Sequence, residues 1–427
     1  MIAWTAPVAT APARGSVVVP GSKSASARSL LLAALADGPS VLTGVLDSRD
    51  TALMRAGLGT LGAAVEDLGQ GTVRVVPGAR VTGGGTVDCG LAGTVLRFLP
   101  PVAALAAEPT LFIGDEAAAT RPIAGLLDAL AALGADVSRP RSLPFRVGGG
   151  PSLRGGAVGI DASTTSQFVS ALLLSGARFP DGVEVSHHGG ALPSVPHIDM
   201  TSALLRRRGV QVERPAEHTW RVAPGRIAPL DEAVEPDLTN AATLLAAALV
   251  TGGELTTAWP EFSVQAADDL LAVLAAFGAG VTYGTGPDGG RTVTVSGPNG
   301  VRGADVDLRT VSELTPVAAA LATLADRPST LRGVAHIRGH ETDRLAALAS
   351  ELTGLGVDAL ETDDGLSIVP GRRSAGTFHT HADHRLAHAA ALIGLVTPGI
   401  VLDDVGCTSK TLPDFPGLWA RLLGAGA

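Results

Sequence analysis

The sequence predicts an α/β protein of two similar lobes, each made of three βαβαββ units with buried helices and outer sheets. The first observation is a recurring apolar helix that ends at a glycine and is followed by two strands joined by a polar turn. The second is an Ala/Leu-rich helix upstream of each of these, and the third is a short β-rich run between the two helices. The glycines that end the recurring helices lie about 70 residues apart, which indicates one supersecondary unit repeated six times. They are Gly62, Gly134, Gly209, Gly278, Gly356 and Gly424.

The upstream helices are apolar on nearly every face, so we expect them to be buried all round. They occupy residues 26–38, 92–108, 165–176, 239–253, 312–326 and 384–394. The β-rich runs follow at 40–47, 109–114, 182–188, 253–259, 329–337 and 399–405. A last glycine-containing helix is expected over 418–427.

The division between the lobes is predicted within residues 223–240, which contain three prolines and show no apolar periodicity. An equal share of six units then requires the segment up to Pro20 to belong with the C-terminal half. We therefore expect lobe one to be 21–233 and lobe two to be 1–20 plus 234–427, with the active site in the cleft between them.

Composition excludes several classes of protein. The formal net charge of -9 argues against nucleic acid as a partner, because binding a phosphate backbone needs a basic face. Two cysteines, Cys89 and Cys407, are too few for a disulfide framework. The N-terminus lacks the features of a signal peptide, and the uncharged stretch 238–253 is too short to span a bilayer. We expect a cytoplasmic monomer without a membrane segment.

Polar residues gather at the predicted helix starts, where unpaired N–H groups and the helix dipole attract anions. Lys23 and Lys410 are the only lysines among 32 basic residues, and both lie beside hydroxyl side chains. A lysine is a compact charge with a tunable pKa, so these two positions are candidates for roles that arginine cannot fill. Hydroxyls alone would be explained by helix capping, but capping does not explain cations at these positions. The cations are Lys23, Arg28, Arg97, Arg121, Arg344, Arg385 and Lys410.

These starts predict a pocket for one or two substrates that carry several carboxylates and phosphates. The nucleotide-binding pattern GxxxxGK[ST] is absent. Two carboxylates, Glu313 and Glu341, are candidate acids or bases. The structural alternative for Glu313 is a partner of the helix dipole, and that for Glu341 is an ion pair with Arg344.

The histidine run 379–388 could hold zinc, with His379 and His381 on a strand and His384 and His388 one helical turn apart. Because the HExxH pattern is missing, we favour polar contact at an anion-binding helix start and expect no metal or cofactor. Cys407 is either a reactive thiol or, more commonly, a buried inert one.

The assembled motifs closely resemble the 5-enolpyruvylshikimate-3-phosphate synthase family, also called the 3-phosphoshikimate 1-carboxyvinyltransferases. They are PGSKSASARSLLLAAL, CGLAGTVLR, ATRPI, TTSQFVSALLLS, HETDRLAAL, ADHRLAHAAALIG and CTSKTLPDF, in order along essentially the whole chain. The resemblance implies the two-lobed inside-out barrel of enolpyruvyl transferases and a target family of the herbicide glyphosate. It implies that the 5-hydroxyl of shikimate 3-phosphate adds to phosphoenolpyruvate and that the tetrahedral intermediate expels phosphate, without metal or redox cofactor.

The resemblance also implies residue roles. Shikimate 3-phosphate would be bound by Lys23, Ser24, Arg28, Thr165, Ser166, Gln167, Ser194, Glu313 and His340. Phosphoenolpyruvate would be bound by Lys23, Gly93, Arg121, Gln167, Arg344, Arg385 and Lys410. Glu313 would be the base at the 5-hydroxyl, and Glu341 with Lys23 or Lys410 would handle the proton at C3.

Three positions depart from many members of the family, which have Asp for Glu313, Lys for His340 and Asn for Leu91. Three further functions remain open: an enolpyruvyl transferase acting on UDP-N-acetylglucosamine, a non-catalytic anion-binding repeat protein, and a zinc hydrolase built on the histidine run 379–388. The first uses a loop cysteine as an acid, and neither cysteine here lies in a matching motif.

Overall fold

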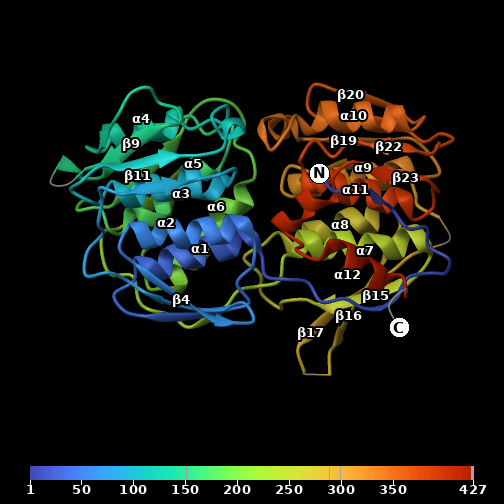
Figure 1. Cartoon of the computed structure of the whole chain (residues 1–427), viewed down its shortest axis with the longest axis horizontal. Coiled ribbons are helices and arrows are strands. Elements are labelled where there is room, and N and C mark those ends of the chain that lie inside the picture. The colour runs from blue at the N-terminus through green and yellow to red at the C-terminus, as the bar shows by residue number, and fades with distance from the viewer. Residues whose placement is uncertain (150–151, 288, 299, 425–427) are drawn as a thin grey trace. The chain divides into compact units, whose positions relative to one another are not determined.

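The structure is a computed structural model that describes residues 1–149, 152–287, 289–298 and 300–424. It divides into two compact units. The first unit is Gly21–Glu235, and the second unit combines Met1–Pro20 with Pro236–Ala427. Within its described residues, each unit contains three small sheets and their helices, so the predicted α/β class and the sixfold repeat are confirmed (Figure 1).

The first unit holds three repeats. The first comprises α1 (Lys23–Ala34), β3 (Ser40–Thr43), α2 (Arg49–Thr60), β4 (Ala64–Gly69), β5 (Thr72–Val76) and β14 (Glu232–Ala233). The second comprises β6 (Thr86–Asp88), α3 (Gly93–Ala103), β7 (Thr110–Ile113), η1 (Glu116–Ala118), α4 (Ala124–Ala132), β8 (Asp136–Val137) and β9 (Phe145–Gly148). The third comprises β10 (Gly156–Ile160), α5 (Gln167–Gly176), β11 (Val183–His187), α6 (Val195–Arg207), β12 (Val212–Ala216) and β13 (Thr219–Val222).

The second unit repeats this plan. Its first repeat comprises β2 (Arg14–Ser16), α7 (Leu238–Thr251), β15 (Glu254–Ala258), α8 (Ala267–Ala276), β16 (Gly280–Thr285) and β17 (Arg291–Ser296). Its second comprises β18 (Asp305–Asp307), η3 (Ser312–Leu314), α9 (Thr315–Thr323), β19 (Ser329–Arg332), η4 (Ala335–Gly339), α10 (Arg344–Gly354), β20 (Asp358–Glu361) and β21 (Leu366–Val369). Its third comprises β22 (Gly376–Phe378), α11 (His384–Gly394), β23 (Ile400–Leu402), η5 (Val405–Lys410), α12 (Phe415–Leu422) and β1 (Trp4–Thr5).

Five of the six sheets among the described residues share one four-stranded order, and the sixth is the three-stranded sheet β1-β23-β22. In the sheet β6-β7-β9-β8, β6 is parallel to β7 and the other neighbours are antiparallel. The parallel pair needs a crossover, and the buried helix α3 supplies it. The antiparallel β8–β9 pair then closes the repeat, which is the βαβαββ unit that the sequence predicts.

The two ends of the repeat series are completed by strands from distant parts of the chain. In the first unit β14 pairs in parallel with β3, with Glu232 opposite Leu42. In the second unit β2 pairs in parallel with β15, and β1 pairs antiparallel with β23 through Trp4 and Leu402. The segment Met1–Pro20 therefore completes two sheets of the second unit.

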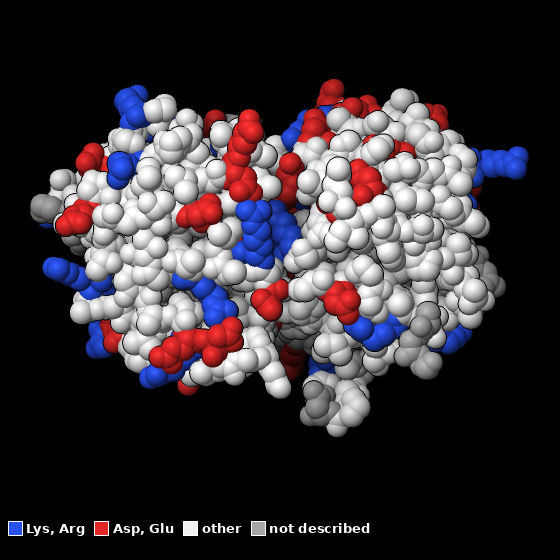
Figure 2. All heavy atoms as spheres, viewed as in Figure 1, with Lys and Arg blue, Asp and Glu red and all other residues white. Residues whose placement is uncertain are grey.

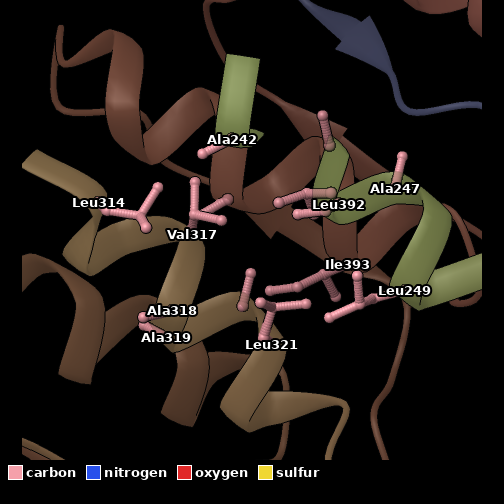
Figure 3. Close-up of a cluster of buried hydrophobic side chains, with 14 of the residues drawn as sticks. Ala242, Ala247, Leu249, Leu314, Val317, Ala318, Ala319, Leu321, Leu392 and Ile393 are labelled. Carbon is pink, nitrogen blue, oxygen red and sulfur yellow. The ribbon is translucent and has the colours of Figure 1, made fainter. Parts of the chain in front are cut away.

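The first helix of each repeat forms the core. In the second unit α7, α9 and α11 contact one another, and every residue of α9 and α11 is buried. Figure 3 shows Val317 and Leu321 of α9 packed with Leu392 and Ile393 of α11. Small alanines such as Ala318 let these helices approach closely, and each fully buried Leu or Ile stabilises the fold by roughly 1.5–3 kcal/mol.

The second helix of each repeat is amphipathic and ends where the sequence predicts. α8, for example, buries Leu270, Leu271, Val273 and Leu274 and leaves Asp268 and Asp269 exposed. All six helix-ending glycines have positive φ, between 73° and 105°. Only glycine adopts this conformation without strain, so the glycines fix the reversal from helix to strand.

The last predicted helix is confirmed as α12, which begins at Phe415 and ends at Leu422. Residues 425–427, also assigned to this helix from the sequence, lie outside the described residues. In the part of the chain that the structure describes, none of the helices has the length and apolar character needed to cross a bilayer.

Candidate functional site

The glycine turn before α1 places Lys23 at the first position of that helix. A Cβ on Gly21 would overlap the carbonyl oxygen of Gly44, so no other residue fits this turn. Ser22 caps the helix by accepting a hydrogen bond from the Ala25 N–H at 3.3 Å. Lys23 Nζ lies 3.9 Å from Asp50 Oδ2, and the lysine side chain keeps 18% of its surface exposed. A partly exposed ammonium at a helix start is suited to binding an anion.

Arg28 lies deeper than its position in the motif suggests. Its side chain is buried, and burial lowers the pKa of the guanidinium to about 9. Arg28 Nε donates to Thr201 Oγ1 at 2.7 Å, Nη1 donates to the Ser24 carbonyl at 2.9 Å, and Nη2 donates to the His197 carbonyl at 3.2 Å. Arg28 therefore ties the start of α1 to α6, and Ser24 contributes its backbone to this link.

The guanidinium groups of Arg97 and Arg121 lie next to Gly93 at the start of α3. A Cβ on Gly93 would lie 2.9 Å from Arg97 Nη1 and 3.1 Å from both terminal nitrogens of Arg121. Arg97 is buried and donates to Gln167 Oε1 at 2.9 Å and to the Pro122 carbonyl. Arg121 donates to the Leu91 carbonyl at 2.9 Å and is partly exposed. Arg121 is thus the outer cation of the pair and Arg97 the inner one.

Two further helix starts complete the group in the first unit. Ser166 is the buried N-cap residue of α5, and Gln167 N donates to Thr165 Oγ1 at 3.2 Å. Ser194 precedes α6 with φ 50° and ψ 45°, a conformation that few residues other than glycine adopt. The N-cap side chains of α5 and α6 make no capping hydrogen bond. In α5 the first N–H group, that of Gln167, is bound by the Thr165 hydroxyl instead.

Arg344 is the centre of the candidate site in the second unit. It is fully buried, and its Nε donates to Asp383 Oδ2 at 2.7 Å. Its terminal nitrogens donate to Glu313 Oε2 and to Glu341 Oε2, both at 2.9 Å. Burial lowers the pKa of the guanidinium, but these carboxylates together raise that pKa well above its usual value. Three carboxylates thus fix one cation in a single orientation.

Glu313 lies in the 3₁₀ turn η3, immediately before α9, and keeps 29% of its side chain exposed. Arg385 Nε lies 3.5 Å from the same Oε2 that accepts from Arg344. Burial raises the pKa of the Glu313 carboxyl, but the charges of Arg344 and Arg385 hold that pKa well below its usual range. Glu313 is therefore ionised at neutral pH. Arg385 is held in turn by Asn240 Oδ1 at 3.0 Å, which links the starts of α11 and α7.

Glu341 connects the second lysine to this cluster. Lys410 Nζ lies 2.5 Å from Glu341 Oε1, while Glu341 Oε2 accepts from Arg344. Lys410 and Glu341 keep 14% and 16% of their side chains exposed. A short ammonium–carboxylate contact at the edge of solvent is suited to passing a proton to a bound molecule.

His340 is a neutral hydrogen-bonding group. Its Nδ1 lies 3.0 Å from Arg344 Nη1, and because arginine only donates, Nδ1 must accept and the ring proton sits on Nε2. Burial lowers the pKa of His340 to about 3 and that of the adjacent His336 to about 4. His336 in turn makes a 3.0 Å hydrogen bond to Ser312 Oγ.

The predicted placement of His379 and His381 on a strand is wrong, because β22 ends at Phe378. His379 pairs with Asp403 and His381 with Glu351, whereas His384 and His388 are buried on α11. Among the described residues, no group of three or more His, Cys, Asp or Glu side chains is arranged to hold a metal ion.

The cysteines are not activated. Burial raises the pKa of the Cys89 thiol and of the Cys407 thiol to about 12. Both remain protonated at neutral pH, so neither is a nucleophile there.

The sequence analysis missed two residues of the second unit, Asp383 and Asn240. Asp383 is completely buried, caps α11 and holds Arg344, while Asn240 holds Arg385. Asp383 directly precedes an apolar helix, which is the signature of an N-cap and the one signal that could have drawn attention to it.

Comparison with known proteins first defines the class. An EPSP synthase from Acinetobacter baumannii superposes with a TM-score of 0.83 at 22% identity and covers 98% of both chains. The enolpyruvyl transferase NikO from Streptomyces tendae superposes with a TM-score of 0.75 at 20% identity, over 97% of this chain and 96% of that one. These likenesses show that the fold is that of the enolpyruvyl transferases.

The sequence then defines the family. Residues 8–419 match the family described as EPSP synthase (3-phosphoshikimate 1-carboxyvinyltransferase). A 3-phosphoshikimate 1-carboxyvinyltransferase from Mycobacterium ulcerans (strain Agy99) is 51% identical over 432 residues, covering 98% of this chain and 97% of that protein. The chain belongs to the EPSP synthase family.

Proposed function

We propose that this protein transfers the enolpyruvyl group of phosphoenolpyruvate to the 5-hydroxyl of shikimate 3-phosphate, the reaction of its family in the shikimate pathway. The hydroxyl adds to C2 of phosphoenolpyruvate while C3 gains a proton. The tetrahedral intermediate then loses phosphate, and C3 gives up a proton to restore the double bond.

The first unit supplies the groups for the phosphorylated acceptor. A phosphate and a carboxylate need cations and N–H donors in a fixed arrangement. Lys23 supplies a partly exposed cation, and the hydroxyl residues Thr165, Ser166 and Ser194 stand at the starts of α5 and α6, while the buried Arg28 holds the start of α1 in place. In this proposal shikimate 3-phosphate is bound by Lys23, Ser24, Arg28, Thr165, Ser166, Gln167 and Ser194.

The enolpyruvyl donor requires cations for its own carboxylate and phosphate. The partly exposed Arg121 lies against Gly93, where the absence of a Cβ lets the guanidinium groups of Arg121 and Arg97 approach the helix start. In this proposal phosphoenolpyruvate is bound by Lys23, Gly93, Arg121, Gln167, Arg344, Arg385 and Lys410.

Glu313 is the proposed base at the 5-hydroxyl. Its carboxylate is ionised, partly exposed and fixed on one side by Arg344, so the second oxygen can accept from a substrate hydroxyl. His340, with its proton on Nε2, would donate a hydrogen bond to the same acceptor molecule. Glu therefore serves where many family members have Asp.

Glu341 and Lys410 are proposed to handle the proton at C3. Their 2.5 Å contact lets a proton pass between a carboxylate and an amine without a large movement of either side chain. Lys23 is the alternative proton donor, and its ammonium lies 3.9 Å from the carboxylate of Asp50. The shorter contact favours Lys410.

One observation carries the proposal. Glu313, Glu341 and Lys410 are brought into one connected cluster around Arg344, although they are up to 97 residues apart (Glu313 to Lys410). A structural ion pair needs only two partners, whereas this cluster joins two glutamates, a lysine and two arginines. The glutamates and the lysine are also partly exposed, so a ligand can reach them.

The test is phosphate release by the pure, EDTA-treated protein supplied with shikimate 3-phosphate, with phosphoenolpyruvate, and with both. We expect release only with both substrates, and a loss of at least 100-fold in Lys23→Ala and Lys410→Ala. Arg226→Ala is the matched cation control, because Arg226 lies exposed beside Asp37, and it should keep full activity. Release with phosphoenolpyruvate and UDP-N-acetylglucosamine instead would overturn the assigned acceptor.

We also propose a cytoplasmic monomer that binds small anions and no nucleic acid. On the face drawn in Figure 2, among the described residues, basic and acidic side chains are scattered between uncharged ones. Such a surface lacks the continuous basic face that a phosphate backbone requires. Size-exclusion chromatography with light scattering tests the monomer, and a mass of twice 42.8 kDa would exclude it.

A further inference from the structure

The orientation of Arg344 depends on a short turn between β22 and α11. Asp383 at the end of this turn binds Arg344 through two hydrogen bonds, of 2.7 Å and 3.3 Å. Both side chains have no exposed surface. Any shift of the turn would therefore move the carboxylate that sets the direction of the guanidinium.

The turn is held in a conformation that its residues do not favour. His381 and Ala382 have φ values of 52° and 55°, so two successive residues with a Cβ adopt the left-handed conformation. This arrangement persists only where neighbouring contacts enforce it. Contacts that enforce the turn are therefore of interest for the site.

Glu351 on α10 provides two such contacts. Its Oε1 lies 2.8 Å from His381 Nε2, and its Oε2 accepts from the His379 N–H at 2.9 Å. Because a carboxylate oxygen accepts, His381 Nε2 is the donor in this contact. Glu351 is 8% exposed and lies two helical turns after Arg344 on the same helix.

We infer that Glu351 is a positioning residue for Arg344, acting through the turn that carries Asp383. Helix α10 carries the cation at its first position and Glu351 in its interior. Glu351 binds the turn through His379 and His381, and Asp383 at the end of the turn binds Arg344. These contacts form a closed ring within the second unit. Asp403 adds support from the residue after β23, because its Oδ1 accepts from Thr380 N at 2.8 Å and from Thr380 Oγ1 at 2.9 Å.

This inference rests on the proposed function, in which Arg344 binds phosphoenolpyruvate. Glu351→Gln keeps the shape of the side chain but places an amide group against one of two N–H donors. We expect the KM for phosphoenolpyruvate to rise about tenfold with kcat within threefold, because the loss concerns one charge-assisted hydrogen bond. The KM for shikimate 3-phosphate and the melting temperature serve as parallel readouts.

Five further variants separate positioning from general damage. His381→Ala should raise the KM for phosphoenolpyruvate as Glu351→Gln does, and the double variant should be no worse than either single one. His381→Gln restores a hydrogen-bond donor and should recover most of the affinity. Ala382→Gly changes the same turn without touching the link and should stay within twofold of the wild type. Glu361 is a carboxylate paired with Arg338 in the same unit, and Glu361→Gln should also leave the KM for phosphoenolpyruvate unchanged.

An unchanged KM for phosphoenolpyruvate in a folded Glu351→Gln protein would overturn the inference. Equal losses for both substrates with a lowered melting temperature would do so too, because they indicate general damage. If the wild type shows no turnover, the proposed function fails, and crystal structures then decide the inference separately. An Arg344–Asp383 pair that keeps its two bonds in Glu351→Gln would refute it, and a displaced turn would support it.

Discussion

Replacing Gly93 by alanine should separate substrate affinity from stability. The new Cβ would lie 2.9 Å from Arg97 Nη1 and 3.1 Å from the two terminal nitrogens of Arg121, against an ordinary contact of at least 3.4 Å. Real Cβ atoms essentially never come as close as the 2.9 Å approach to Arg97, whereas the 3.1 Å approach to Arg121 is tight and requires only a small adjustment. The question is which of them can move.

Arg97 has little freedom, because it is buried and bonded to Gln167 and Pro122. A small shift of Arg97 or of the helix start must relieve the 2.9 Å approach. Arg121 is partly exposed and donates a hydrogen bond to the Leu91 carbonyl, so we expect it to be displaced further than Arg97. A displaced guanidinium weakens one charge-assisted contact with the donor, which corresponds to about 1.5 kcal/mol or roughly a tenfold rise in the KM for phosphoenolpyruvate. Alanine is also the better helix former, so stability should not fall.

The assay is steady-state kinetics with each substrate varied in turn, combined with thermal denaturation. Gly59→Ala is the matched control, because it adds the same methyl group to a helical glycine with nothing within 4 Å. We expect the KM for phosphoenolpyruvate to rise in Gly93→Ala alone, with the melting temperature unchanged or higher in both variants. A normal KM in Gly93→Ala would refute the steric argument, and a lowered melting temperature would show that Arg97 was displaced further instead.

Three further predictions concern the fold around the sites. Burial lowers the pKa of His388 well below 6.5. Below pH 6.5 the unfolded chain therefore binds a proton at this histidine that the folded chain does not bind, and the free energy of unfolding decreases as the pH falls. His388→Leu should reduce the pH dependence of the unfolding free energy by up to about 1.4 kcal/mol per pH unit below 6.5, and equal slopes in urea titrations would contradict this. Gly21→Ala should lower the free energy of unfolding by more than about 3 kcal/mol, because the new Cβ meets a backbone carbonyl. Gly225→Ala has open space around its Cβ and should leave stability unchanged, and similar denaturation midpoints for the two variants would contradict this prediction. Asp383→Asn keeps the helix cap but leaves Arg344 with less negative charge in a fully buried position, so chemical denaturation should show a loss of about 3 kcal/mol, and a loss under about 1 kcal/mol would show that the other carboxylates suffice.

The repeat could be predicted from the sequence because its signals are local. A helix-ending glycine with positive φ is required wherever an α-helix turns directly into a strand, so Gly62 and Gly356 mark equivalent points in different units. The pairing of β14 with β3 could not be derived, since Glu232 and its partner Leu42 lie far apart in the sequence and no local pattern records their contact.

The site was predicted less evenly. Lys23 and Lys410 stand out by composition alone, and Glu341 pairs with Arg344 as its spacing suggested. The burial of Arg28 did not follow from its position near a helix start, because depth depends on the neighbouring α6. His379 and His381 were misplaced because β22 ends at Phe378, three residues before His381, whereas His384 and His388 lie on a helix as predicted.

The two units use their helix starts differently. In the first unit the N-cap residues of α1 to α6 carry no charge: Ser22, Ser48, Ala92, Ile123, Ser166 and Ser194. In the second unit four α-helices are capped by aspartates that accept backbone hydrogen bonds: Asp237, Asp343, Asp383 and Asp414. A carboxylate cap offsets the positive end of the dipole, whereas a neutral cap leaves it for a ligand.

This difference assigns separate tasks to the units. Where the caps are neutral, the helix ends themselves attract anions, and the side chains need only add Lys23 and Arg121. Where aspartates occupy the helix ends, anions must be bound by arginine side chains, and Arg344 and Arg385 stand at the starts of the aspartate-capped α10 and α11. Of these aspartates, Asp383 also binds Arg344, the guanidinium that holds Glu313 and Glu341. In the proposed function, recognition of the phosphorylated acceptor therefore belongs mainly to the first unit, and acid–base chemistry belongs to the second.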